Sequence, residues 1–354
     1  MKRITWIIIV GLLLLTACQN KKVTYVGDDP NVALIVAKRG DMAYNDIAII
    51  GMNVSERDHG TNLTILEHEN NPDNYDKVFM DAVNAYNHVV MMSSNMKETL
   101  EKHADKYPEI KFLLYDGEID WSKGDFSNVY CIVYRANEAA YLSGYLAAGM
   151  SETGVIGFIG GVDNTNIDDL AVGYIEGAKK KNPDIKIMVD YAGSFDDVEK
   201  GKNIASQMIG NNADIIFGAA GSVNLGILEV LNEKDLYMIG TDTDQYMRLI
   251  ADGKEDLAEN IITSVMKNIS HNLYDAIGNY TQREVITGET KVVGLKEDGV
   301  AIAKNDHYKE LVPAELQSEI DTQEKDIISG KINVPTSRAL SHEEVEKLIE
   351  SVKP

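Results

Sequence analysis

The sequence predicts an α/β protein of two Rossmann-like lobes, each built on a parallel sheet and joined to the other by a hinge. Three observations support this fold class. Short apolar runs rich in β-branched residues alternate with longer stretches whose apolar positions repeat about every 3.6 residues. This alternation runs once through the first part of the chain and starts again near residue 155. The chain also has 354 residues, more than one hydrophobic core usually serves.

The first lobe alternates strands with helices from residue 32 onward. Elements in this order form parallel sheets with helices on both faces. The expected strands cover residues 32–37, 61–67, 88–93, 111–115 and 129–134, and the expected helices cover residues 42–56, 75–86 and 96–107.

The second lobe repeats this order and is followed by extra elements. Its expected strands cover residues 155–161, 185–191, 213–219 and 236–241, and its expected helices cover residues 167–181, 198–210 and 224–233. A long helix over 256–278, strands over 291–295 and 300–303, and helices over 314–328 and 342–352 complete the chain. We therefore expect the chain to cross back between the lobes, so that residues 31–134 and about 255–290 form lobe one, and residues 135–254 and about 291–354 form lobe two.

The N-terminus carries the pattern of an export and lipidation signal. Two basic residues precede an apolar stretch over residues 6–15, and Leu15-Thr16-Ala17-Cys18 matches a lipobox. The stretch is short for a helix that spans a membrane permanently. We expect residues 1–17 to be a signal peptide, Cys18 to be lipidated, and residues 18–30 to tether the body to the extracytoplasmic face of the cell membrane. The alternative is an ordinary signal peptide, or a short hydrophobic helix, with a chance cysteine.

Composition argues against several classes of function. The chain has 34 basic and 56 acidic residues and a net charge of −22, and no basic patch interleaved with aromatic residues offsets it, so nucleic acid is not an expected partner. The seven histidines have no metal-ligand spacing, and we expect no metal or other cofactor. Besides Cys18 the chain has only Cys131, which lies in an apolar run and is expected to be a buried thiol.

Polar residues recur where the expected strands end, and they predict a cleft between the lobes. Carboxyl ends of parallel strands meet at one edge of a sheet, which is where ligands bind open α/β sheets. Each segment alone is typical of turns and helix caps, but their recurrence at the same end of several strands favours a site. The segments are residues 39–46, 115–117, 192–197, 218–222 and 240–245.

The residue types in these segments indicate a polar, neutral ligand with a flat ring. Tyr44 and Phe195, one in each lobe, are placed to sandwich a heterocycle. Asp116 and Asp242 are placed to accept hydrogen bonds from ring amines or sugar hydroxyls. Lys267 is expected to reach the cleft from the start of a helix or to neutralise Asp242, and its alternative is a solvated helix lysine.

Five segments of the chain match one known family together. They are residues 141–148 (YLSGYLAA), 156–161 (IGFIGG), 193–202 (GSFDDVEKGK), 219–222 (AAGS) and 240–245 (GTDTDQ). They resemble the basic membrane protein family, the lipoprotein substrate-binding proteins of ABC importers that include purine nucleoside receptors. The resemblance runs from about residue 32 to 299 and implies a type I periplasmic-binding fold, three crossovers between the lobes, and capture of a nucleoside when the cleft closes.

The resemblance also implies roles for single residues. Ribose hydroxyls would be held by Asp242 and Lys267, and the base would be contacted by Asp116 and stacked between two rings. The remaining matches are Tyr44 and Phe195 for the stacking rings, Asn45 for the amide that follows the first ring, and Gly221 for the glycine turn near the ligand.

The first loop departs from the family. Family members usually place an Asp directly after strand one, whereas Ala37-Lys38-Arg39 stands here and the loop is shorter. The carboxylate that would contact the base is missing unless Asp41 replaces it, and Lys38 or Arg39 would admit a more electron-rich or anionic ligand. Losing one hydrogen-bonding group of this kind changes which base a site accepts.

Three functions from different classes follow from the sequence. The first is a monomeric, membrane-anchored receptor that captures a nucleoside, most simply a purine nucleoside, and delivers it to an ABC permease. The second is a surface sensor of the same fold with an altered ligand. The third is a nucleoside hydrolase with Asp46, Asp116 or Asp242 as base, which the lack of a hydrolase motif or metal-binding motif disfavours.

Overall fold

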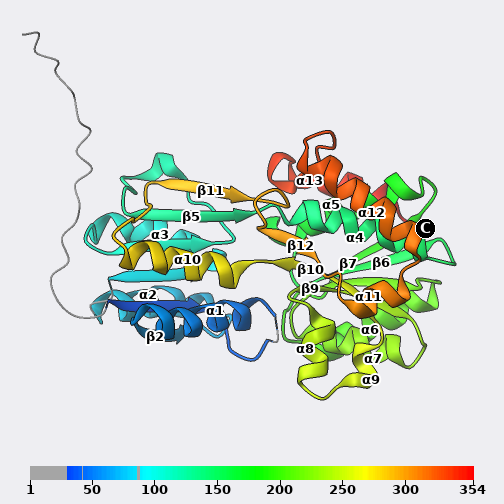
Figure 1. Ribbon diagram of the computed structural model, residues 1–354, viewed down its shortest axis with the longest axis horizontal. Coiled ribbons are helices and arrows are strands. Elements are labelled where there is room, and N and C mark those ends of the chain that lie inside the picture. Colours follow the sequence, from blue (N-terminus) through cyan, green and yellow to red (C-terminus); the bar gives the residue numbers. More distant parts are fainter. Residues whose placement is uncertain (1–29, 42, 86–87) are drawn as a thin grey trace, which may run out of the picture.

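The computed structural model describes residues 30–41, 43–85 and 88–354. Two lobes lie side by side along the longest axis of the molecule (Figure 1). The predicted signal peptide, Cys18 and nearly all of the predicted tether lie outside the described residues. Among the helices that are described, none combines the length and the apolar character needed to cross a bilayer.

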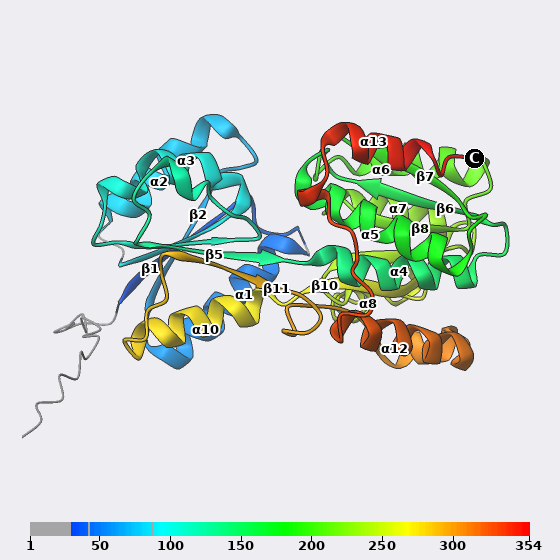
Figure 2. The same cartoon turned by 90° about the horizontal axis from the view of Figure 1, so that it is seen from above.

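The first lobe is built on a six-stranded sheet in the order β11-β5-β4-β3-β1-β2, and all its strand pairs are parallel. Helices α2 and α3 cover one face of this sheet and α1 and α10 cover the other (Figure 2). The strands are β1 (Asn31–Val36), β2 (Asn62–Glu67), β3 (Val89–Ser93), β4 (Lys111–Tyr115), β5 (Val129–Tyr134) and β11 (Glu289–Val293). The helices are α1 (Tyr44–His59), α2 (Tyr75–Asn84), α3 (Lys97–His103) and α10 (Ile269–Thr281).

The second lobe has a six-stranded sheet in the order β12-β10-β9-β8-β6-β7, in which only β12 is antiparallel to its neighbour. The two sheets confirm the predicted fold class. The strands are β6 (Val155–Gly160), β7 (Lys186–Tyr191), β8 (Ile215–Ala219), β9 (Tyr237–Asp242), β10 (Ile261–Lys267) and β12 (Val300–Ile302). The helices are α4 (Ala136–Met150), α5 (Thr165–Lys181), α6 (Val198–Gly210), α7 (Val223–Asn232), α8 (Gln245–Ala251), α9 (Glu255–Ala258), α11 (Asp306–Leu311), α12 (Ala314–Ile328) and α13 (His342–Glu350).

The chain passes between the lobes three times, after β5, after β10 and after β11. Each sheet therefore contains strands from distant parts of the sequence, as expected for discontinuous lobes. Because the crossings lie beside the carboxyl ends of several strands, they bring the strand-end loops of both lobes to the same place.

The long helix predicted over residues 256–278 is wrong. The structure has the short helix α9, then the buried strand β10, then α10. Six of the seven residues of β10 are buried, so both of its faces are covered and its sequence does not alternate apolar with polar positions. Such a sequence does not differ in periodicity from a buried helix. With β10 in the second sheet, the second crossing follows Lys267, and not residue 254 as expected.

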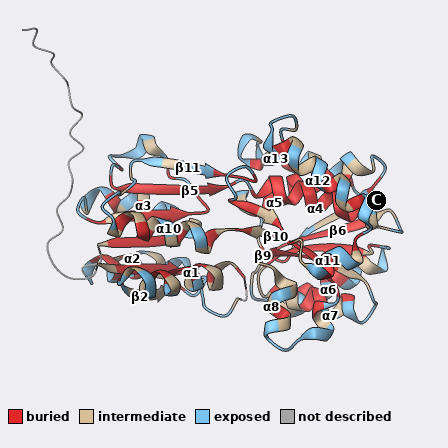
Figure 3. Ribbon diagram, in the orientation of Figure 1, coloured by how far each residue is buried: buried red, intermediate tan, exposed pale blue. Residues whose placement is uncertain are grey.

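Helix α4 carries no amphipathic pattern because it is buried on almost every side, as the colouring of Figure 3 shows. It packs closely on α5 through glycines. A Cβ atom added to Gly144 would lie 2.0 Å from the carbonyl oxygen of Tyr174, and one added to Gly177 would lie 1.8 Å from that of Tyr141. These glycines let the two helix backbones approach, so the family-like segment 141–148 has a packing role in the second lobe.

Candidate functional site

A cavity of about 280 Å³ lies between the lobes at the carboxyl ends of their strands. Residues of both lobes line it, so a ligand inside would touch both. All eight residues predicted to bind a ligand line this cavity, namely Asp41, Tyr44, Asn45, Asp116, Phe195, Gly221, Asp242 and Lys267.

The buried end of the cavity holds one ammonium group between two carboxylates. The Nζ atom of Lys267 lies 2.8 Å from Oδ2 of Asp116 and 3.6 Å from Oδ1 of Asp242. The side chains of Lys267 and Asp116 are each 4% exposed, and that of Asp242 is 14% exposed. Lys267 ends strand β10, so the prediction that it begins a helix is wrong, whereas its predicted pairing with Asp242 is present.

Electrostatics at this end are set by burial and by the excess carboxylate. Burial raises the pKa of Asp242 to about 6, since the attraction of Lys267 offsets it only in part and Asp116 adds repulsion. Burial also opposes the charge of Lys267, but Asp116 and Asp242 outweigh it and raise the pKa of this lysine. Lys267 is therefore charged at neutral pH, and one carboxylate remains in excess at the floor of the cavity.

Both carboxylates stand on left-handed backbone. The φ angle is 59° at Asp116 and 67° at Asp242, a conformation that residues other than glycine rarely adopt. Local strain of this kind persists where the surrounding structure fixes it, and it concentrates at binding and active sites.

Two aromatic rings face the cavity from opposite lobes. Tyr44 begins α1, and its ring centroid lies 5.6 Å from that of Tyr115 and 5.5 Å from Nζ of Lys267. Phe195 comes from the loop after β7, and its ring lies over Gly161, where an added Cβ atom would come within 2.2 Å of it. A Cβ on Gly221 would lie 3.1 Å from the carbonyl oxygen of Phe195, and the φ angle of 58° at Gly221 favours glycine. These glycines make room for the second ring.

The carboxylate of Asp41 is occupied by its own loop. Its Oδ1 accepts hydrogen bonds from the backbone N–H groups of Ala43 and Asp46, each at 3.1 Å. Its Oδ2 accepts from the backbone of Asn45 at 2.8 Å and from the side-chain amide of Asn45 at 2.7 Å. The Asn45 side chain in turn accepts from the backbone N–H of Ala37 at 3.0 Å. Asp41 and Asn45 thus fix the turn from β1 into α1.

Hydrogen bonds between the two lobes bridge residues that line the cavity. Asn166 at the start of α5 donates to the backbone oxygen of Asp116 at 2.8 Å and to Oγ of Ser94 at 3.2 Å. Arg338 holds the other end of this amide by donating to its oxygen at 2.5 Å. At the rim Asn70 donates to Asp196 at 2.8 Å.

Three of these bridging residues, Asn70, Asn166 and Arg338, were not predicted from the sequence. Asn166 belongs to a strand-end segment, residues 161–166, that the same rule would have included, since it follows β6 and begins α5. The further polar residues that line the cavity are Lys38, Arg39, Asn70, Ser93, Ser94, Asn95, Asn164, Asn166, Asp196, Ser222 and Thr241.

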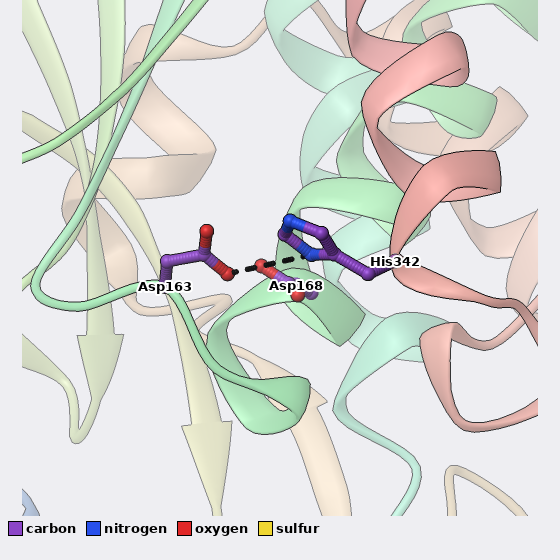
Figure 4. Close-up of side chains that lie close together, drawn as sticks. All are labelled: Asp163, Asp168 and His342. Atoms are coloured by element: carbon purple, nitrogen blue, oxygen red, sulfur yellow. Dashed lines mark ion pairs between the residues drawn. The ribbon is translucent and has the colours of Figure 1, made fainter.

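A second group of titratable side chains lies outside this cavity, where α13 packs near the start of α5 (Figure 4). His342 Nδ1 lies 3.9 Å from Asp163 Oδ1, and its Nε2 lies 3.3 Å from Glu346. The buried Asp168 accepts a hydrogen bond from Tyr191 at 2.7 Å. The separation of 3.9 Å is wider than the roughly 3.3 Å between two ligands of one tetrahedral zinc ion. The described contacts are those of an ion-pair network that joins α13 to the loop before α5.

Comparison with known proteins shows which family this chain resembles. The family model described as "ABC transporter substrate-binding protein PnrA-like" matches residues 31–338. Basic membrane protein A2 of Borrelia garinii is 31% identical over 96% of this chain and 97% of its own length. A Lactococcus lactis protein named as the ABC transporter nucleoside-binding protein BmpA is 33% identical over 68% of this chain and 69% of its own.

Solved structures agree with the fold. A solute-binding protein of an ABC transporter system from Aeropyrum pernix has a TM-score of 0.80 and 22% identity, covering 92% of this chain and 97% of that one. A similar protein from Conexibacter woesei has a TM-score of 0.69 and 19% identity, covering 87% and 99%. At these identities the likeness concerns the fold, which is the type I periplasmic-binding fold.

Proposed function

Because this chain belongs to the PnrA-like family of ABC transporter substrate-binding proteins, we propose that it captures a purine nucleoside in the cavity between its lobes and delivers it to an ABC importer. Members of this family bind substrates for transport and are not enzymes, so the hydrolase alternative is set aside. What we propose beyond the family's role is that the substrate is a purine nucleoside and that the protein delivers it to an importer.

One observation carries the proposal: two aromatic rings and a buried lysine with two carboxylates line the same cavity. Tyr44 and Phe195 provide apolar faces for a flat base from opposite lobes. Asp242, with its excess negative charge, accepts hydrogen bonds from ribose hydroxyls, and Lys267 donates to the same sugar. An uncharged ligand fits this cavity if it has a flat end for the aromatic rings and a hydroxyl-rich end for Asp242 and Lys267.

Asp41, Asn45 and Gly221 act in this proposal by holding the rings in place. The hydrogen bonds of Asp41 and Asn45 fix the start of α1 and so the position of Tyr44. Gly221 leaves space for the loop of Phe195. Asp116 links the lobes through Lys267 and through Asn166, so it stabilises the closed form while it contacts the base.

We also propose that the mature protein begins at the lipidated Cys18 and works as a monomer outside the membrane. A lipid anchor with the tether over residues 18–30 would keep the cavity near its permease at high effective concentration. Two lobes with the three crossings between them would open and close while the tether absorbs the motion.

A panel of nucleosides tests the proposal through thermal unfolding. Inosine, guanosine or adenosine should raise the melting temperature, because a ligand at a hundredfold excess over its dissociation constant stabilises the folded state by about 2.7 kcal/mol. Pyrimidine nucleosides, free bases and ribose belong in the same panel. Without a shift from any nucleoside at millimolar concentration the receptor proposal fails, and release of free base during incubation would contradict the binding role.

A further inference from the structure

The loop from Ala37 to Asn45 departs from its family, and the structure shows which of its described polar side chains are free to meet a ligand. Asp41 already accepts four hydrogen bonds from its own loop, and a carboxylate has about four acceptor sites. Both ends of the Asn45 amide are likewise bonded within the loop. Asp41 cannot accept a hydrogen bond from a ligand without releasing the start of α1, whereas the buried Asn45 oxygen keeps one acceptor site beside its bond from Ala37.

Arg39 lines the cavity but is held by the neighbouring strand. Its Nε lies 2.8 Å from Oε1 of Glu67, and its Nη2 donates to the backbone oxygen of Ile65 at 3.4 Å. The backbone N–H of Arg39 also donates to Glu67 at 3.0 Å. The guanidinium is therefore anchored to β2.

Lys38 differs from all of these. It is exposed at the mouth of the cavity and lines it, and among the described residues no hydrogen bond or ion pair engages its side chain. An ammonium group donates hydrogen bonds and accepts none. Its flexible four-carbon stem lets it follow a base that stacks on Tyr44, which belongs to the same segment. The ammonium group of Lys38 is thus a charged group of this loop that is available to a ligand, and it can only donate hydrogen bonds.

Purine bases differ in what they present to such a donor. The edge that carries N7 and position 6 shows two acceptors, N7 and O6, in guanine and hypoxanthine, whereas adenine shows the acceptor N7 beside an N6 amine that donates. An ammonium beside N6 would face another donor, and the loop has no free carboxylate to accept from that amine. A 6-oxo group satisfies the lysine instead.

We propose that Lys38 makes this site selective for 6-oxopurine nucleosides, inosine and guanosine, over adenosine. This proposal rests on the nucleoside-binding function proposed above and names its substrate class. A phosphate would also accept from Lys38, but it would have to enter a cavity that contains the carboxylates of Asp116, Asp196 and Asp242.

Calorimetric titration of the purified full-length protein with inosine, guanosine, adenosine and inosine 5′-phosphate tests the proposal. We expect inosine and guanosine to bind about tenfold more tightly than adenosine. This ratio corresponds to the free energy by which well-placed hydrogen bonds distinguish one base from another. Lys38→Met should bring the three affinities to within about threefold by weakening inosine and guanosine alone. Lys38→Arg, which keeps a donor-only cation, should retain the preference.

The controls separate this proposal from the function on which it rests. Lys234→Met removes an exposed lysine outside the cavity and should change none of the affinities. If no nucleoside binds the wild-type protein, the proposed function fails. If all three bind equally, or Lys38→Met weakens all three alike, only the role of Lys38 is overturned. Tighter binding of inosine 5′-phosphate than of inosine, lost in Lys38→Met, would also overturn it by assigning the lysine to a phosphate.

Discussion

Replacing Lys267 by methionine should lower the free energy of unfolding by about 3–5 kcal/mol at neutral pH, the cost of leaving buried charge unpaired. The lysine is the cation beside both Asp116 and Asp242; its side chain and that of Asp116 are each 4% exposed, and that of Asp242 is 14% exposed. Without it the two carboxylates repel each other and must bind protons or water. Denaturant unfolding of the wild-type and variant proteins measures the loss, and nucleoside binding should disappear with it.

Two comparisons show whether charge causes the loss. Adding Asp116→Asn and Asp242→Asn to Lys267→Met should restore most of the stability, because removing a buried ion group as a whole is often nearly neutral. Lowering the pH from 7 to 5 should shrink the loss in the single variant, because burial raises the pKa of Asp242 to about 6 and its protonation removes one of the two charges. As a matched control, Lys77→Met breaks an exposed ion pair with Asp81 and should cost less than about 1 kcal/mol. A loss for Lys267→Met that stays unchanged in the triple variant would contradict this account of the site.

Replacing Phe195 by alanine should weaken nucleoside binding by about 1–3 kcal/mol while leaving the melting temperature of the free protein nearly unchanged. Its ring lines the cavity from a loop and is only partly buried, so its removal takes a stacking face from the ligand and little from the core. Titration calorimetry with inosine measures the change in affinity.

The conservative variants Phe195→Tyr and Tyr44→Phe serve as controls for the two rings. Each keeps an aromatic face in the cavity, so each should bind within about threefold of the wild-type protein. Equal affinity of Phe195→Ala and the wild-type protein would show that the ligand does not stack on this ring. A large loss in Tyr44→Phe would instead assign the hydroxyl group, and not the ring face, to the ligand.

The fold was predictable where each strand is short, apolar and bounded by turn residues. Strands β1 to β9 meet this description, and the structure contains a strand at each expected place. Strand β10 was not predicted, because few turn residues separate it from the short helix before it and the long helix after it. A strand that is buried on both faces also lacks the alternation of apolar and polar residues that identifies a strand. Helix α4 was not among the predicted helices, because it has no exposed face and its sequence therefore shows no amphipathic period.

Part of the cavity lining was predictable from the rule that parallel strands end at the same edge of a sheet. This rule and the family resemblance placed Asp116, Phe195 and Asp242 in the lining without any contact being known. Which of these side chains already have hydrogen-bond partners in the protein was not predictable. That Asp41 is saturated and Lys38 is free depends on how the backbone turns into α1, which no residue spacing reports. The same rule would have included Asn166, which follows β6, but its bonds to Ser94 and Asp116 on the other lobe were not predictable.

A crystal structure of the protein grown with inosine would show whether a nucleoside occupies the cavity and how it lies there. We expect one nucleoside between the lobes, with its base between Tyr44 and Phe195 and its ribose hydroxyls within hydrogen-bond distance of Asp242 and Lys267. A nucleoside bound outside this cavity, or a cavity without nucleoside at saturating inosine, would contradict this expectation.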